Sequence, residues 1–157
     1  MTEQAFEQQV TALTQEMYRV AAGLLRGHQD RQDAVQACVL KAWQGLPRLR
    51  DEGLFRAWLM RILINECRSL GRARRREIAA EEIEIPQEAE DSCLRDEELH
   101  RAVLALPEKL RLTVTLYYMD GLSLRETAHA LRVPEGTVKG RLYQARKQLR
   151  AMLEREV

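Results

Sequence analysis

The sequence predicts an all-α protein made of two small helical domains, and three observations support this prediction. Leu, Ala, Arg, Gln and Glu dominate the chain, and all five favour helices, whereas aromatic residues make up only 5% of it. Apolar residues recur at helical spacing on both sides of a break. That break covers about 20 residues without a sustained apolar stripe, and loops of that length are uncommon inside one domain.

The expected domain boundaries follow from this break. We expect a first domain at residues 1–76, an acidic linker at 77–95 and a second domain at 96–157. The linker contains Pro86 and many carboxylates. A chain of 157 residues with 45% apolar residues is long enough for two small cores.

Three helices with inward apolar stripes are expected in the first domain. The first covers about residues 5–26, the second is capped by Asp30 and ends at Pro47, and the third runs from about Leu54 to Arg74. In the second and third helices the expected inward residues are Ala34, Val35, Cys38, Val39, Ala42, Trp43, Leu46, Phe55, Trp58, Leu59, Ile62 and Leu63. The expected outward face of the third helix carries Arg56, Met60, Arg61, Ile64, Asn65, Arg68 and Arg72.

The second domain shows helix start and stop signals in close succession. A helix starts near Asp96, Pro107 suits the first turn of the next helix, and Gly121 ends that helix. Ser123 and Glu126 then form a capping box for a short helix. The three-residue turn "LRV" and Pro134 lead into a last helix that runs to about Glu154. Two helices joined by so short a turn are typical of a helix-turn-helix motif.

The last helix has two chemically different faces. Its expected buried stripe is Val138, Leu142, Ala145, Leu149 and Leu153. The opposite face carries Glu135, Lys139, Gly140, Tyr143, Gln144 and Lys147, flanked by Arg141, Arg146 and Arg150. Flanking bases suit phosphates and the central face suits base edges in a major groove. The alternative is an amphipathic helix whose charged face only meets solvent.

Charge is arranged in blocks although the net charge is only +1. Residues 61–76 carry six Arg residues against Glu66 alone, whereas residues 77–98 are acidic with Arg95 as their one base. An outward face of Arg, Asn and apolar groups on the third helix suits unstacked bases, which need flat apolar support and hydrogen bonds. The alternative is a face covered by a protein partner.

Other functional classes are disfavoured by the sequence. Cys38, Cys67 and Cys93 have no metal-ligand spacing, so we expect two buried thiols, one linker thiol and no metal or cofactor. No signal peptide or apolar run of membrane-spanning length is present, so we expect a cytoplasmic protein without membrane insertion. Because the nucleophile, phosphate-loop and zinc-protease motifs are missing and the three His residues are isolated, we expect no enzyme.

Four segments in order resemble the extracytoplasmic-function sigma factors, the smallest class of bacterial RNA polymerase sigma subunits. The resemblance covers about Met17 to Leu153, and its most specific parts are "DAVQACVLKAW", "LFRAWLMRILINECRSLGRARRR", "ALPEKLRLTVTLYYMDGLSLRETAHAL" and "VPEGTVKGRLYQARKQLR". It implies a subunit that directs core polymerase to promoters by reading the −35 element as duplex and opening the −10 element. The family is commonly held by an anti-sigma factor.

The resemblance also assigns residues. It implies that the first domain binds core polymerase at the β′ clamp helices through Asp33, Gln36 and Lys41, with the β flap as a further contact. The loop "RLRDEGLF" matches the one that captures a flipped base. The residues implied at the −10 element are Arg50, Asp51, Arg61, Asn65, Arg68 and Arg72.

In the second domain the resemblance assigns the last helix to the −35 element. Base-proximal positions match Lys139, Gly140, Tyr143 and Gln144, and phosphate-proximal positions match Thr137, Arg141 and Arg146. Gly140 stands where Ser is usual in the family. The main alternative function is a stand-alone helix-turn-helix regulator that binds an operator without polymerase.

Overall fold

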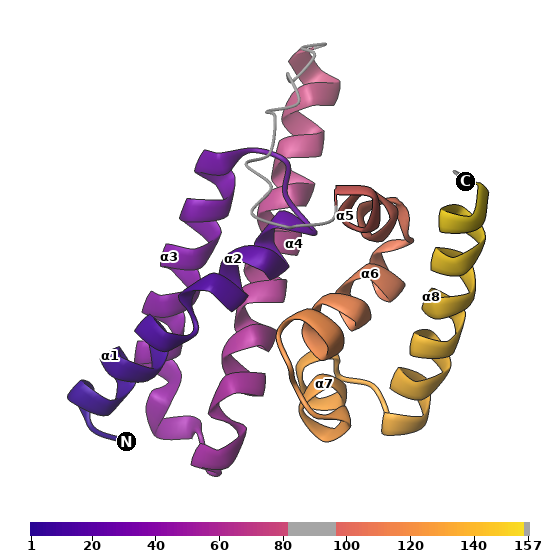
Figure 1. Ribbon diagram of the computed structural model, residues 1–157. Helices are drawn as coiled ribbons and strands as arrows, with labels where there is room; N and C mark the ends of the chain where they lie inside the picture. The colour runs from indigo at the N-terminus through magenta and orange to yellow at the C-terminus, as the bar shows by residue number, and fades with distance from the viewer. Residues whose placement is uncertain (82–96, 156–157) are drawn as a thin grey trace. The chain divides into compact units, whose positions relative to one another are not determined.

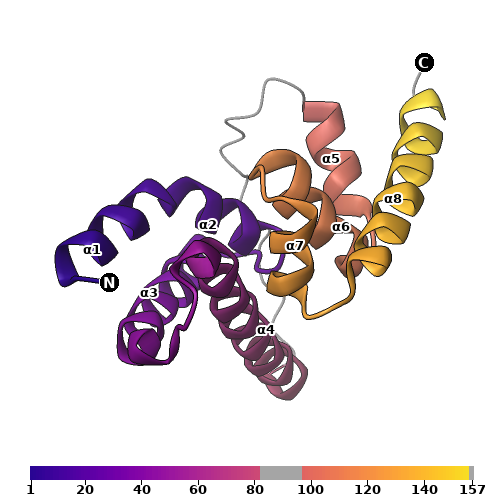
Figure 2. The ribbon, with the colours of Figure 1, turned by 90° about the horizontal axis from the view of Figure 1, so that it is seen from below.

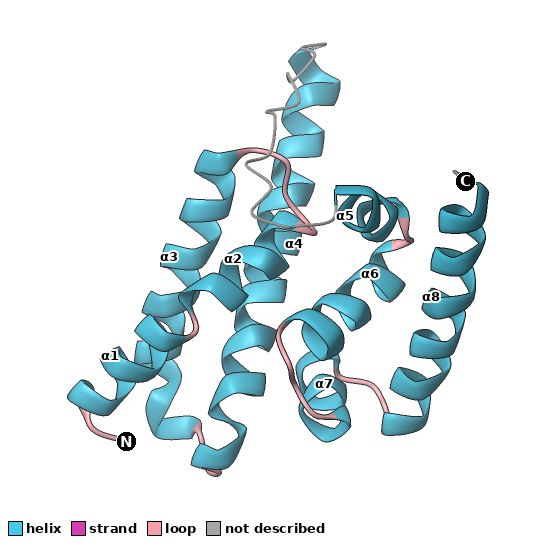
Figure 3. Ribbon diagram, in the orientation of Figure 1, coloured by secondary structure: helices cyan, strands magenta, loops and turns pink. Residues whose placement is uncertain are grey.

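The computed structural model describes residues 1–81 and 97–155, and within these ranges it contains helices and loops but no strand (Figure 3). The chain divides into two compact units, Met1–Glu88 and Ala89–Val157. The all-α prediction is therefore confirmed. The predicted linker overlaps the end of a helix that continues to Glu81, and the rest of it lies outside the described residues.

The first unit is built around one long helix, α4 (Figures 1 and 2). Its elements are α1 (Glu3–Ala12), α2 (Thr14–Ala22), α3 (His28–Gly45), the 3₁₀ turns η1 (Leu46–Arg48) and η2 (Glu52–Leu54), and α4 (Phe55–Glu81). Both α2 and α3 pack against α4, and they also pack against each other. α4 therefore has neighbours on two sides.

The two-sided packing of α4 corrects one prediction. Met60 and Ile64, expected on the outward face, are buried with 0% and 2% of their surface exposed. Phe55, Leu59 and Leu63 are buried as predicted. A helix between two neighbours needs apolar residues on two faces, so the assumption of a single inward stripe placed Met60 and Ile64 wrongly.

The first predicted helix is in fact two helices that meet at Leu13. The hydroxyls of Thr11 and Thr14 donate to the carbonyls of Glu7 and Val10, at 2.7 and 3.1 Å. Such bonds to the carbonyl four residues back compete with the helix ladder and bend helices. The prediction of one continuous helix over residues 5–26 was therefore wrong.

Two predictions about α3 are also corrected. Its N-cap is Gly27 without a side-chain cap, and Asp30 lies inside the helix, where Arg74 of α4 binds its carboxylate. Trp43, expected inward, is 42% exposed and its ring lies 5.2 Å from that of Phe6 in α1. Ala34, Val35, Cys38 and Ala42 form the buried side as predicted.

The second unit consists of α5 (Glu97–Ala105), α6 (Glu108–Val114), the π-helical turn η3 (Thr115–Met119), α7 (Leu124–Leu131) and α8 (Glu135–Arg155) (Figure 1). α5, α6 and α7 all pack against α8. One cluster joins Val103, Leu106, Leu110 and Val114 to Ala145, and a second joins Ala128 to Val138 and Leu142. Within the described residues, no helix is long and apolar enough to cross a bilayer.

The predicted helix from Pro107 is not α-helical to its end. After α6 the chain widens into η3, where the Asp120 N–H donates to the Thr115 carbonyl at 2.9 Å, five residues back. Gly121 follows with a φ of +73°, a conformation that glycine adopts without a side-chain clash. Gly121 thus ends this segment as predicted, and the extra residue per turn in η3 had no signal in the sequence.

Candidate nucleic-acid and partner interfaces

The corner between α7 and α8 is fixed by local hydrogen bonds. The Glu126 N–H donates to Ser123 Oγ at 3.0 Å and the Ser123 N–H donates to Glu126 Oε1 at 3.1 Å, so the predicted capping box is confirmed. Arg132 ends α7 in the left-handed conformation with a φ of +58°. The Val133 N–H then reaches the Ala128 carbonyl at 3.1 Å. These contacts set the angle between the two helices of the motif.

α8 buries one face and exposes the other. Val138, Leu142 and Ala145 are buried with 0 to 4% exposure, as predicted, and Leu149 is partly buried. Lys139, Gly140, Tyr143, Gln144 and Arg146 are exposed, whereas Thr137 and Arg141 are half-buried at its edge. Tyr143 is 64% exposed, and an added Cβ at Gly140 would meet no atom within 4 Å. The face predicted to contact DNA is therefore open and continuous.

The exposed side of α3 forms a second surface, which we call the α3 surface. It comprises Asp33, Gln36, Leu40 and Trp43, which follow helical spacing. Leu40 is 57% exposed and Trp43 is 42% exposed, so this face presents two large apolar side chains together. Asp33 accepts a hydrogen bond from Gln29 Nε2 at 3.0 Å.

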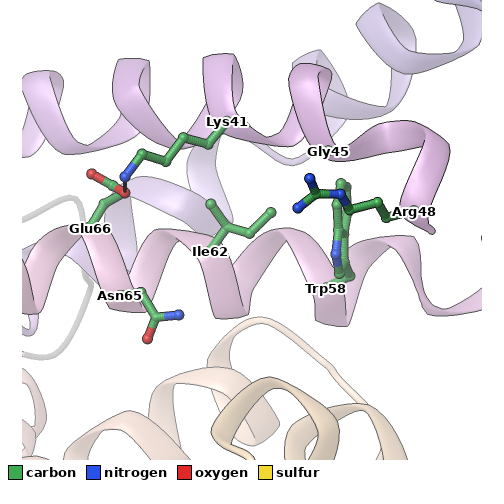
Figure 4. A pocket seen from close by; sticks show the side chains of 7 residues that line it. All are labelled: Lys41, Gly45, Arg48, Trp58, Ile62, Asn65 and Glu66. Carbon is green, nitrogen blue, oxygen red and sulfur yellow. Dashed lines mark ion pairs between the residues drawn. The ribbon is translucent and has the colours of Figure 1, made fainter.

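Lys41 does not belong to the α3 surface. Its ammonium group forms an ion pair with Glu66 of α4, and together they border a cavity of about 330 Å³ between α3 and α4 (Figure 4). Its lining residues are Lys41, Gly45, Arg48, Trp58, Ile62, Asn65 and Glu66. Arg48 and Trp58 lie at one end, Lys41 and Glu66 at the other, and Ile62 lies between them.

Trp58 and Ile62 were expected in the core, but both are only partly buried and line this cavity. The cavity thus combines an aromatic ring, an aliphatic side chain, a guanidinium group, an amide and an ion pair. An aromatic or apolar wall with a few placed polar groups can hold a flat heterocycle.

The loop after α3 follows directly on Arg48, which lines the cavity, and Asp51 stabilises part of this loop. The Asp51 carboxylate accepts a hydrogen bond from the Gly53 N–H at 2.9 Å and caps η2. Arg50 and Asp51 are both exposed. Asp51 therefore has a structural role in the loop in addition to the predicted one.

The remaining predicted residues lie along α4. Asn65 and Arg72 are exposed, whereas Arg61 and Arg68 are half-buried. The Nε atom of Arg61 is buried. Only Asn65 of these four also lines the cavity. The structure therefore does not gather all of the predicted −10 residues into one site.

The two described cysteines are buried thiols, as predicted, and Cys93 lies outside the described residues. Cys38 Sγ donates to the Leu59 carbonyl at 3.5 Å. Burial raises the pKa of Cys38 and of Cys67 from the ordinary 9.0 to about 12, and the charge of Glu66 adds to the increase. Such thiols stay protonated at neutral pH, so they are inert packing groups.

Comparison with known proteins accounts for both units. Residues 10–77 match the family model of sigma-70 region 2, and residues 96–149 match that of sigma-70 region 4. The extracytoplasmic-function (ECF) RNA polymerase sigma factor SigM of Mycobacterium tuberculosis is 33% identical over 153 residues, which are 95% of this chain and 77% of SigM. The chain belongs to the ECF sigma factor family. It is an RNA polymerase sigma factor in which region 2 precedes region 4, as predicted.

Solved structures support the same assignment. The sigma factor RpoE of Bartonella quintana, in complex with the anti-sigma factor NepR, matches with a TM-score of 0.80 and 26% identity, covering 96% of this chain and 97% of RpoE. CnrH, in complex with the cytosolic domain of CnrY, matches with a TM-score of 0.73 and 27% identity, covering 99% of this chain and 92% of CnrH.

Sequence reasoning did not assign several residues of these surfaces to an interface. Leu40 carried a detectable signal, because it is a large apolar residue one turn beyond Gln36 on an otherwise polar face. The cavity walls Trp58 and Ile62 did not, since their spacing also fits a core stripe. Tyr118 of η3 was missed because its exposure depends on a π-helical turn.

Proposed function

We propose that this ECF sigma factor binds core RNA polymerase through the α3 surface, reads the upstream promoter element with α8 and receives a base of the opened downstream element in the α3–α4 cavity. The observation that carries the proposal is the division of α8 into a buried face and an open face. We place this activity in the cytoplasm, where the polymerase works, and assign catalysis to the polymerase.

The contribution of α8 rests on shape and chemistry. Lys139, Tyr143 and Gln144 lie on its open face, and Gly140 adds no bulk there. A side-chain amide can pair with adenine, and a ring edge can contact a thymine methyl group in the major groove. Thr137, Arg141 and Arg146, which border that face, are assigned to phosphates.

At the downstream element, the flipped base is assigned to the α3–α4 cavity and not to the whole outward face of α4. Trp58 and Ile62 supply apolar walls, and Asn65 and Arg48 supply donors around them. Arg50 and Asp51 of the adjacent loop are assigned to the same flipped base. Arg61, Arg68 and Arg72 are assigned to the strand along α4. Unstacking a base costs a few kcal/mol, which such contacts must offset.

For core polymerase we assign Asp33 and Gln36, as the family resemblance implies, and add Leu40 as an apolar anchor. Exposed apolar residues with polar neighbours are typical of interface centres. Lys41 is assigned a lesser role there, because its ammonium group is engaged by Glu66. The β′ clamp helices are the proposed partner of this surface, and the β flap is a further contact.

An anti-sigma factor is a further proposed partner. The support comes from RpoE and CnrH, since the first was solved with an anti-sigma factor and the second with the cytosolic domain of CnrY. Met60 and Ile64 of α4 do not contribute to such a contact, because both residues are buried.

Run-off transcription tests the proposal directly. Purified chain and core polymerase, separately and together, are given a library of promoter-length genomic fragments, and transcripts are sequenced. We expect transcripts from fragments that share a two-part motif only when both proteins are present. Lys139→Ala should shift or weaken the upstream part of the motif, while core binding, measured by co-sedimentation, stays intact.

The matched control is Lys109→Ala, which removes an exposed cation of the same unit from α6, a helix to which no DNA contact is assigned. A chain that binds specific duplexes alone and yields no polymerase-dependent transcripts would instead be a stand-alone regulator. Loss of core binding in folded Lys139→Ala would contradict the division of labour between the two units.

A further inference from the structure

Tyr118 and Arg146 meet on the surface of the second unit, although 28 residues separate them. Arg146 Nη1 donates a hydrogen bond to Tyr118 Oη at 2.6 Å. Tyr118 is 50% exposed and Arg146 is exposed, so the pair is not part of the core. Arg146 borders the open face of α8, and Tyr118 extends that border onto η3.

The position of Tyr118 is determined by its backbone. The π-helical turn is closed by the bond from Asp120 to Thr115, and the Leu122 N–H donates to the Leu116 carbonyl at 3.0 Å. The Tyr118 ring also meets the Tyr117 ring edge-on, with centroids 5.0 Å apart. Tyr117 in turn packs against the cluster of Ala128, Val138 and Leu142. The hydroxyl is therefore carried by a braced ring, and π-helical turns are frequent at functional sites.

The chemistry of the pair leaves donors available. A tyrosine hydroxyl accepts through its oxygen lone pairs and also carries one donor hydrogen, so accepting from Arg146 does not consume that hydrogen. The guanidinium group has five N–H donors, of which this bond uses one. A cation and a hydroxyl held side by side can both donate to one phosphate group.

We propose that Tyr118 is a positioning residue for duplex DNA. It holds the Arg146 guanidinium beside α8 and, together with it, binds a single backbone phosphate at the flank of the groove. The inference rests on the proposed function of α8. The physical benefit is entropic, since a long Arg side chain that is already ordered loses less rotamer freedom on binding.

The test uses holoenzyme and a promoter fragment recovered by run-off transcription. Closed-complex affinity is measured at several salt concentrations for wild type, Tyr118→Phe, Arg146→Ala and the double variant. Tyr18→Phe, in α2 of the other unit, is the matched loss of a tyrosine hydroxyl. We expect Tyr118→Phe to weaken binding about three- to tenfold with an unchanged thermal midpoint, and Tyr18→Phe to have no effect.

Salt dependence separates the two residues. Arg146→Ala should reduce the slope of log affinity against log salt by about 0.9, because one phosphate contact is lost. Tyr118→Phe should leave the slope unchanged, because the cation remains. Its effect on affinity should shrink in the Arg146→Ala background, since nothing is then left to position.

Four outcomes overturn the inference. Unchanged affinity in Tyr118→Phe, with a promoter still bound, rejects it and leaves the proposed function intact. Equal effects of Tyr118→Phe with and without Arg146, or a fall in thermal midpoint that accounts for the loss, also reject a positioning role. If the library yields no promoter, the proposed function fails and this inference fails with it.

Discussion

Arg74 in α4 grips the Asp30 carboxylate at the start of α3 through three N–H···O contacts of 2.9 to 3.2 Å, although 44 residues separate them. The Asp30 side chain is only 14% exposed, and Glu77 adds a second carboxylate to the same guanidinium at 3.2 Å. Planar two-point binding of this kind fixes orientation as well as distance. The contact thus sets how the ends of α3 and α4 lie against each other.

We expect Arg74→Ala to lower the thermal midpoint of the first unit by a few degrees, because the Asp30 carboxylate loses its partner in a poorly hydrated place. Arg75→Ala removes the same charge from the next, exposed position and should change the midpoint little. Differential scanning calorimetry of both variants decides the point. Equal midpoints for the two would mean that the pair contributes nothing to stability.

Leu40 and Lys41 should behave differently in binding core polymerase, although they are neighbours in sequence. Leu40→Ala should weaken binding about ten- to a hundredfold without loss of stability. The reason is that this exposed leucine becomes buried only on association, where its burial contributes about 1.5 to 3 kcal/mol to the binding free energy. Fluorescence anisotropy with labelled chain gives the affinity. Leu99→Ala, a 38% exposed leucine of the second unit, is the control.

Lys41→Ala should lower stability more than it lowers core affinity, because it leaves the half-buried Glu66 without its ion-pair partner. A result in which Lys41→Ala abolishes binding and Leu40→Ala does not would show that the α3 surface was drawn on the wrong side of the helix.

The buried thiols predict a loss of stability at alkaline pH. In the unfolded chain Cys38 and Cys67 release their protons near pH 9.0, whereas in the folded chain burial holds the pKa of each at about 12. Between these values the unfolded chain binds fewer protons, so the free energy of unfolding falls as pH rises. The stabilising contribution of the two protonated thiols is complete below pH 9.0. Above it, the free energy of unfolding falls by at most about 1.4 kcal/mol per pH unit for each thiol.

Urea unfolding at a series of pH values from about 8 to about 11 measures how the free energy of unfolding changes with pH. The double variant Cys38→Ala/Cys67→Ala should show a shallower decline, because it lacks the two buried thiols whose deprotonation favours the unfolded chain. Identical slopes for the two proteins would contradict the role of the thiols.

Gly140 offers a stabilising substitution. An added Cβ meets nothing within 4 Å, and Gly140 lies inside α8, so Gly140→Ala should raise the free energy of unfolding by about 1 kcal/mol. Gly136→Ala also adds a methyl group in open space, but it lies in the first turn, where the gain is smaller. Urea unfolding compares them, and a destabilised Gly140→Ala would show that glycine is needed for the backbone there.

Local sequence signals were sufficient to predict most helix boundaries of the second unit. The capping box of Ser123 and Glu126 and the start of α8 after Pro134 were predicted, because these interactions span only a few residues. The buried stripe of Val138, Leu142 and Ala145 followed from spacing alone. The sequence alone is therefore sufficient to place the candidate DNA contacts on the exposed face of α8.

The errors in the first unit have a different origin. Met60, Ile64 and Trp58 were assigned from one helical stripe, but burial along α4 depends on two neighbouring helices. Such packing is a tertiary property that spacing within α4 does not contain. The same holds for the Lys41–Glu66 pair and the cavity beside it, which require the register of α3 against α4.

The separation of the two faces of α8 has an evolutionary consequence. Val138, Leu142 and Ala145 maintain the core, and none of them belongs to the face that Lys139, Tyr143 and Gln144 expose. After gene duplication, one copy can therefore accumulate changes on the open face at little cost to its folding. Lineages of such chains can diverge in the genes they activate while their scaffold remains nearly constant.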